Sequence, residues 1–222
     1  MKRTHTIAAL AVATGLAACE GGFGVAGGDT EVLLSQGGSA PVASALASEL
    51  LANSALGNVS LSSVEQIEVT LTGVDALPQG EADVEEGAWI SLTLTETAVI
   101  DLLDLPGEED GGIQIARGDL PAGTYGNLRL FVEGASITFN TGVEVGPQSF
   151  DAGVEYDLFI PSADQTGVKV PDATFTVSEG DGETVVVVFD ADTSVQNVTA
   201  AGASGTIIMN PVLRAGAANT DE

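Results

Sequence analysis

The sequence predicts a mainly β protein, an antiparallel sandwich with one short helix near its N-terminus. In VEQIEVTL (64–71) the apolar residues Ile67, Val69 and Leu71 alternate with polar ones, as in a strand that has one buried and one wet face. About nine or ten such segments follow one another, divided by Gly, Pro, Asn or Asp turns and without intervening helices. Aliphatic and β-branched residues dominate the apolar content, which suits sheets.

Residues 1–18 have the pattern of a secretory signal peptide. Lys2 and Arg3 give a positive start, and an uncharged, mainly apolar segment (7–18) follows. That segment is shorter than the ~20 residues that a membrane-spanning helix needs. Its end resembles the bacterial lipobox, in which the leader is cut before a cysteine whose thiol is then acylated: Leu16, Ala17, Ala18 and Cys19.

Lipid attachment at Cys19 would make the membrane the first partner of this chain. One acyl chain anchors only marginally, whereas the two or three chains of bacterial lipoproteins, palmitate among them, hold a protein durably. Glu20 stands where aspartate would indicate retention in an inner membrane, so we expect an exported protein on the outer membrane, at its periplasmic face or the cell surface. Residues 19–30 are rich in glycine and predict a flexible tether.

A single domain is expected over residues 31–214. Its first strand is predicted at 31–35, and PVASALASELLANSAL (41–56) predicts a helical insertion, since Pro suits a first helical turn and Gly57 suits the exit. VVVV (185–188) predicts a central strand covered on both faces. GTIIMNPVLR (205–214) closes the domain, with its proline at an edge or bulge. Residues 215–222 are expected to fray.

Composition excludes several classes of function. The full chain has a formal net charge of −26, and cleavage after residue 18 leaves four Lys or Arg residues (six minus two) against 32 acidic ones, a charge of −28. The only histidine is lost with the leader, so Ser-His-Asp and Cys-His catalysis and a Cys/His zinc site are not expected within this chain. Nucleic acid is not an expected partner either, because binding phosphates requires a basic surface.

A series of sequence blocks resembles a family of bacterial lipoproteins known as domain-of-unknown-function family 4382. The blocks are VEQIEVTLTGVDA (64–76), DLLDL (101–105), DLPAGTYGNLRL (119–130), TGVKVPDATFTVSEGDGETVVVVFDADTSV (166–195) and IIMNPVLR (207–214). The resemblance implies a Greek-key sandwich, prealbumin-like or immunoglobulin-like, on an exported, lipid-anchored protein, and it implies no activity. The segment 36–62 departs from the family pattern, since the helical stretch replaces a short loop.

Two acidic segments are candidates for calcium. In GEEDGG (107–112) three adjacent carboxylates stand between glycines, and oxygen ligands of this kind suit a hard cation. A weak calcium site is therefore one hypothesis and a solvated acidic turn the other, and no other cofactor is expected; the three residues are Glu108, Glu109 and Asp110. FDADTSVQN (189–197) begins like a calcium loop but lacks its glycine and final glutamate, so Asp190 and Asp192 are expected to cap backbone N–H groups.

The single tryptophan and one arginine are the remaining candidates. Trp89 follows an acidic turn at a predicted strand start, where an exposed ring could stack on a sugar and a buried ring would fill the core. Arg129 lies on the strand face opposite Leu128 and Leu130, and we expect it to pair with a carboxylate.

These patterns predict a non-enzymatic, lipid-anchored β-sandwich of the cell envelope with a structural, adhesive or ligand-binding role. Its partner would be an envelope protein or a polysaccharide. The alternative is a calcium- or carbohydrate-binding envelope lipoprotein whose loops set its specificity. A carboxylate-based hydrolase is a third alternative, since carboxylate pairs occur by chance among so many acidic residues.

Overall fold

The computed structural model describes residues 26–37, 59–81, 88–95, 99–201 and 205–216. The predicted signal peptide, Cys19 and the predicted helix at 41–56 lie outside these residues. Within them the protein is mainly β, as predicted, with fifteen strands, two 3₁₀ turns and one short α-helix. No helix in the described ranges has the length and apolarity to cross a bilayer.

The described strands and helices follow one another along the chain in this order. The first half comprises β1 (Gly27–Gly37), η1 (Leu61–Ser63), β2 (Val64–Pro78), β3 (Ile90–Leu94), β4 (Val99–Asp101), η3 (Glu108–Asp110), β5 (Ile113–Pro121) and β6 (Gly123–Phe139). The second half comprises β7 (Val143–Val145), β8 (Gln148–Phe150), β9 (Glu155–Phe159), β10 (Val168–Val170), β11 (Phe175–Val177), β12 (Glu183–Asp190), α2 (Ala191–Gln196), β13 (Thr199–Ala201), β14 (Thr206–Ile208) and β15 (Leu213–Ala215).

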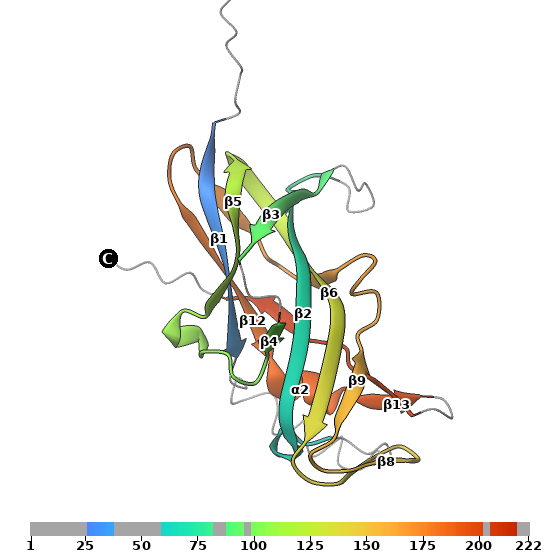
Figure 1. The fold of residues 1–222 in the computed structure, drawn as a ribbon. Coiled ribbons are helices and arrows are strands. Elements are labelled where there is room, and N and C mark those ends of the chain that lie inside the picture. Colours follow the sequence, from blue (N-terminus) through green and yellow to red (C-terminus); the bar gives the residue numbers. More distant parts are fainter. Residues whose placement is uncertain (1–25, 38–58, 82–87, 96–98, 202–204, 217–222) are drawn as a thin grey trace, which may run out of the picture.

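One curled sheet of thirteen strands contains most of the domain. Its order is β13-β14-β9-β6-β2-β3-β5-β1-β12-β15, with β10 and β11 also paired to β6 and β4 to β2, while β7 and β8 form a separate hairpin. In Figure 1 the long strands β2 and β6 run side by side, and β1, β5 and β12 form the other part of the sheet. Side chains from both parts meet in the core, among them Val69, Leu130 and Phe189.

The prediction of a purely antiparallel arrangement is wrong, because the sheet is mixed. Strand β1 pairs in parallel with β12, from Thr30 opposite Glu183 to Gly37 opposite Asp190, and β14 pairs in parallel with β9. The alternation of apolar and polar residues reports which face is buried, but it is the same for either strand direction. A parallel partner requires a long crossover, and most of the domain separates β1 from β12. The Greek-key sandwich itself stays a prediction.

The faces of the central strands agree with the alternation. The apolar residues of β2 that alternate in the sequence are buried, namely Ile67, Val69 and Leu71. On β6 the same alternation buries Leu128, Leu130 and Val132. The run Val185–Val188 is buried throughout, and its strand β12 lies between β1 and β15. The prediction of a central strand covered on both faces is confirmed.

Three local predictions change. Strand β1 begins at Gly27, within the predicted tether, rather than at residue 31. The predicted strand 205–214 is two strands, β14 and β15, which join distant positions of the sheet; Pro211 lies between them, where its missing N–H removes no ladder bond.

The segment 189–197 is a strand exit in which β12 ends at Asp190, and it leads into the helix α2, which the sequence did not predict. As predicted, Asp190 caps a backbone N–H group: its Oδ1 accepts from Thr193 N at 2.9 Å, and this is the N-cap of the six-residue helix. Asp192 accepts from the side-chain amide of Gln196 at 2.9 Å. The hydroxyl of Ser194 donates to Asp190 O and accepts from the N–H of Val212, which ties α2 to the segment before β15.

Candidate functional site

The acidic turn that was a calcium candidate is held by an ion pair. Glu108 accepts from Arg214 on β15, with Nη2 to Oε2 at 2.5 Å and Nη1 to Oε1 at 3.2 Å. Glu109 and Asp110 are exposed. In the described ranges no three His, Cys, Asp or Glu side chains are grouped so that they could hold a metal ion. The ion pair between Glu108 and Arg214 therefore links η3 to the edge strand β15.

Trp89 is buried, with 8% of its surface exposed. The guanidinium carbon of Arg129 lies 4.2 Å from the centroid of the Trp89 ring and 4.7 Å from that of Phe131. A sugar-stacking platform requires an open ring face, so this geometry does not support a carbohydrate site at Trp89. The indole lies outside the main core, on the opposite face of the sheet from Leu128.

Trp89 and Arg129, which the sequence singled out separately, belong to one buried cluster. Asp75 on β2 faces Arg129 on β6 in the register of the two strands, and its Oδ2 accepts from Nε at 3.0 Å and lies 2.9 Å from Nη2. The side chains are only 5% (Arg129) and 9% (Asp75) exposed. The predicted pairing of Arg129 with a carboxylate is confirmed, but nothing in the sequence indicated that the pair is buried. Because the guanidinium bonds the carboxylate of Asp75 and packs against two rings, it stabilises the sheet and is not available to bind a ligand.

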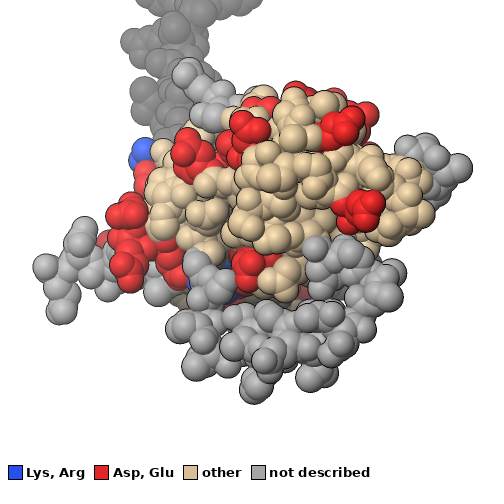
Figure 2. Space-filling model, turned by 90° about the horizontal axis from the view of Figure 1, so that it is seen from below, with Lys and Arg blue, Asp and Glu red and all other residues tan. Residues whose placement is uncertain are grey.

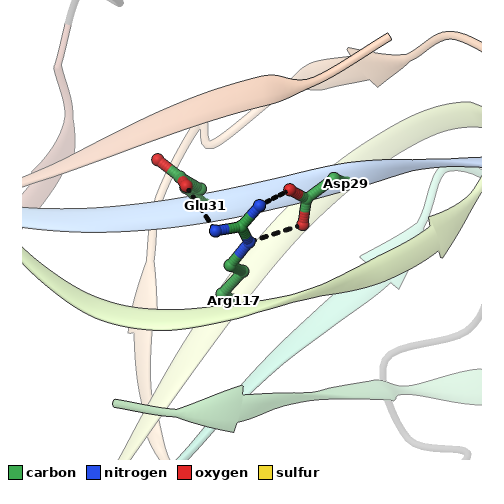
Figure 3. A network of polar contacts seen from close by, with 3 residues as sticks. All are labelled: Asp29, Glu31 and Arg117. Atoms are coloured by element: carbon green, nitrogen blue, oxygen red, sulfur yellow. Dashed lines mark hydrogen bonds and ion pairs between the residues drawn. The ribbon is translucent and has the colours of Figure 1, made fainter. Parts of the chain in front are cut away.

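A second ion pair network lies at the surface of β1 and β5. Figure 3 shows Arg117 between Asp29 and Glu31, both of which come from β1. Its Nε donates to Asp29 Oδ1 at 2.9 Å, a second bond joins Nη2 to Asp29 Oδ2, and Nη1 is 3.4 Å from Glu31. The hydrogen bonds from Arg117 hold the pKa of Asp29 below its ordinary value. This network links the first strand to the sheet, and its cation is already engaged.

A groove opens between β6 and β9, and it is the best candidate for a binding site in the described part of the chain. The two strands pair only over Ser136–Thr138 and Glu155–Asp157, and they separate beyond. A hydrogen bond from Val132 N to Ala163 O (3.0 Å) spans the gap. The resulting groove has a volume of about 130 Å³, and it is lined by residues that include Glu133, Gly134, Leu158, Phe159 and Asp164.

Phe159 distinguishes this groove from the rest of the surface. The residue is 53% exposed, and only Val99 and Val154 are comparable large apolar residues on the described surface. Sequence reasoning missed it, although a signal was present: in VEYDLFI (154–160) the residues Tyr156, Leu158 and Ile160 alternate inward, which leaves Phe159 on the polar face.

A second cavity lies inside the domain between the two parts of the sheet. It measures about 30 Å³ and has an entirely apolar lining that includes Leu34, Leu130 and Phe189. This is the size of roughly one water molecule, and a water needs polar partners. The interior therefore offers no room for a ligand at this place, and the surface groove stands as the candidate.

The structure is therefore an acidic, mainly β domain with a groove on its surface. Its described arginines form ion pairs that link neighbouring strands, or η3 to β15. The family model "Domain of unknown function (DUF4382)" matches residues 58–211, and the chain belongs to this family. The match begins before β2 and ends at Pro211, so it leaves out β1 and β15. No curated protein and no solved structure was found to match the chain.

Proposed function

We propose that this chain is an exported, lipid-anchored domain of the bacterial cell envelope, with a structural, adhesive or ligand-binding role and without catalysis. The observation that carries the proposal is the lipobox-like motif Leu16–Cys19, which follows a leader-like segment and precedes the first strand. The outer membrane is the proposed location, because Glu20 follows the cysteine.

The position of β1 supports an anchoring role for the N-terminal segment. Eight residue steps separate Cys19 from Gly27, and even a fully extended chain covers at most about 29 Å over that length. An acylated Cys19 would hold the domain close to the membrane surface. Strand β1 lies between β5 and β12, so a pull on the anchor would load two strand pairings at once.

The groove supports binding rather than chemistry. Its two carboxylates, Glu133 and Asp164, are on exposed residues, where water surrounds them and a charged partner can reach them. No observation specifically favours the calcium, carbohydrate or hydrolase alternatives, since Glu108 is paired with Arg214 and Trp89 is buried.

Acylation and location can be tested together in a Gram-negative host. The wild-type chain should incorporate a labelled fatty acid and sediment with outer membranes, and Cys19→Ser should lose the label and remain unprocessed or soluble. Glu20→Asp should keep the label and move to the inner membrane, while Glu20→Gln serves as the matched control. An unlabelled wild-type chain that retains its leader would refute the anchor, and labelled Glu20→Asp in the outer membrane would refute the sorting signal.

A further inference from the structure

The size of the β6–β9 groove limits what it can hold. Sites for drug-sized ligands and cofactors measure about 300–1,000 Å³. At about 130 Å³ this groove has room for one side chain of a partner. Gly134 is one of the residues that line it.

The lining has the chemistry of a site for a cation. The Phe159 ring is exposed, and a phenyl face attracts a guanidinium or ammonium group. Glu133 and Asp164 also line the groove, and neither makes an ion pair with another residue in the described ranges. An aromatic face beside two carboxylates favours arginine over lysine, because a planar guanidinium stacks on a ring and can bond a carboxylate through two N–H groups.

The chain contains the same combination in its own interior. Arg129 packs against the rings of Trp89 and Phe131 while its N–H groups bond the carboxylate of Asp75. The groove offers a ring and carboxylates of the same kind, and it lacks the arginine.

The occupant has to come from another protein. The basic residues of the described chain are all engaged: Arg117 with Asp29, Arg129 with Asp75, Arg214 with Glu108, and Lys169 as well. A second copy of this chain would therefore have to give up an existing interaction of Arg117, Arg129, Arg214 or Lys169 to supply a cation from the described residues. Figure 2 shows acidic side chains at many places on the lower end of the molecule and few basic ones, and such a surface attracts a basic partner and repels a copy of itself.

We propose that the groove between β6 and β9 is a docking site for a single arginine side chain presented by a basic partner protein. The guanidinium stacks on Phe159 and pairs with Glu133 and Asp164. This proposal deepens the ligand-binding form of the proposed function and names the chemistry of the partner.

The probe for this site is Nα-acetyl-arginine amide, with Nα-acetyl-citrulline amide as its neutral isostere. The full chain, purified in detergent and labelled with ¹⁵N-glycine, is titrated by NMR, and the Gly134 amide is identified by its loss in Gly134→Ala. The arginine probe should shift the Gly134 signal with a millimolar Kd, and the citrulline probe should shift it far less. Phe159→Ala should weaken binding about two- to fivefold. Glu133→Gln and Asp164→Asn should each weaken it by a similar factor.

Matched variants separate docking from general charge attraction. Glu155→Gln removes one charge from the exposed face of β9, and Val154→Ala truncates an exposed apolar side chain, both outside the groove lining. Both should bind the arginine probe like the wild type. The proposal is overturned if Gly134 does not respond, if citrulline binds equally well, or if Glu155→Gln weakens binding as much as Glu133→Gln. Tighter binding of Nα-acetyl-lysine amide would also overturn it. Fatty-acid labelling tests the lipid anchor at Cys19 independently, so the anchor and the arginine site can each be refuted without the other.

Discussion

The buried pair of Asp75 and Arg129 makes a strong prediction about stability. Both side chains have lost nearly all contact with water, and Arg129 Nη2 lies 2.9 Å from Asp75 Oδ2. Removing one partner of a buried pair leaves an uncompensated charge and costs about 3–5 kcal/mol. We expect Asp75→Leu and Arg129→Met each to lower the free energy of unfolding by an amount in this range, out of a total of about 5–15 kcal/mol for a domain.

The double variant should behave differently from the sum of the single ones. Apolar residues of similar volume in place of both partners remove both desolvation penalties, and such replacements are often neutral or stabilising. Met at position 129 also keeps a polarizable group against the ring of Trp89. We therefore expect Asp75→Leu/Arg129→Met to unfold near the wild-type midpoint. The single variants should melt about 6–20 °C lower, from the usual 2–4 °C per kcal/mol in a chain of this size.

Urea unfolding followed by fluorescence measures this directly, because Trp89 is the only tryptophan and lies against Arg129. An unchanged slope against urea would show that the variants share one unfolding transition. Additive losses in the double variant would show that the two charges are not coupled. A loss below about 1 kcal/mol in both single variants, as for an exposed pair, would show that water reaches them in solution.

Three further substitutions test single groups. Thr30 is fully buried and its hydroxyl has no hydrogen-bond partner among the described residues. Thr30→Val should therefore raise the free energy of unfolding by about 1 kcal/mol, seen as a higher urea midpoint, whereas a lower midpoint would show that the hydroxyl makes a hydrogen bond in solution. Tyr125 donates its hydroxyl to Pro121 O at 2.9 Å, and Tyr125→Phe should cost about 1 kcal/mol. Burial raises the pKa of Tyr125, so wild-type stability should fall as pH rises above 10 and through the folded-state pKa. Urea midpoints measured against pH should show a smaller loss in Tyr125→Phe than in the wild type. Arg117 lowers the pKa of Asp29, so the stability that this ion pair gives the fold should be complete above the ordinary pKa of 3.8 and be lost as pH falls through the folded-state pKa. Asp29→Asn should remove this loss of stability in acid, and 1 M NaCl should reduce it.

The sequence predicted which faces of the strands are buried, because alternation records the contact of each side chain with water or core. It did not predict the strand directions or neighbours. The parallel pairing of β1 with β12 is set by the closure of the whole sheet, which brings Val32 beside Val185 from the far end of the chain. Tertiary contacts of this kind leave no local pattern.

For the candidate functional residues, too, the sequence predicted one feature and missed another. The pairing of Arg129 with a carboxylate was predictable from a charged residue on a strand of a highly acidic chain. Its burial was not, because it depends on Trp89 covering the second face of the sheet from the start of the next strand. The groove arises where β9 leaves β6 and its residues Leu158 and Phe159 pair with β14, a change of partner that no local pattern predicts.

The glycines at the start of β1 give a last prediction, since the sequence placed them in a flexible tether and the structure places them in the sheet. A Cβ added to Gly27 would lie 2.3 Å from Leu120 O, and one added to Gly28 would lie 2.2 Å from Asp181 O, both backbone atoms that cannot turn aside. Gly28→Ala should therefore cost about 1–3 kcal/mol through overpacking. Gly134→Ala is the matched control, because a Cβ there meets nothing closer than 4.0 Å and the substitution should be neutral or slightly stabilising in urea unfolding. Equal stability of both variants would mean that the sheet begins after residue 28 and that the tether is as long as the sequence suggested.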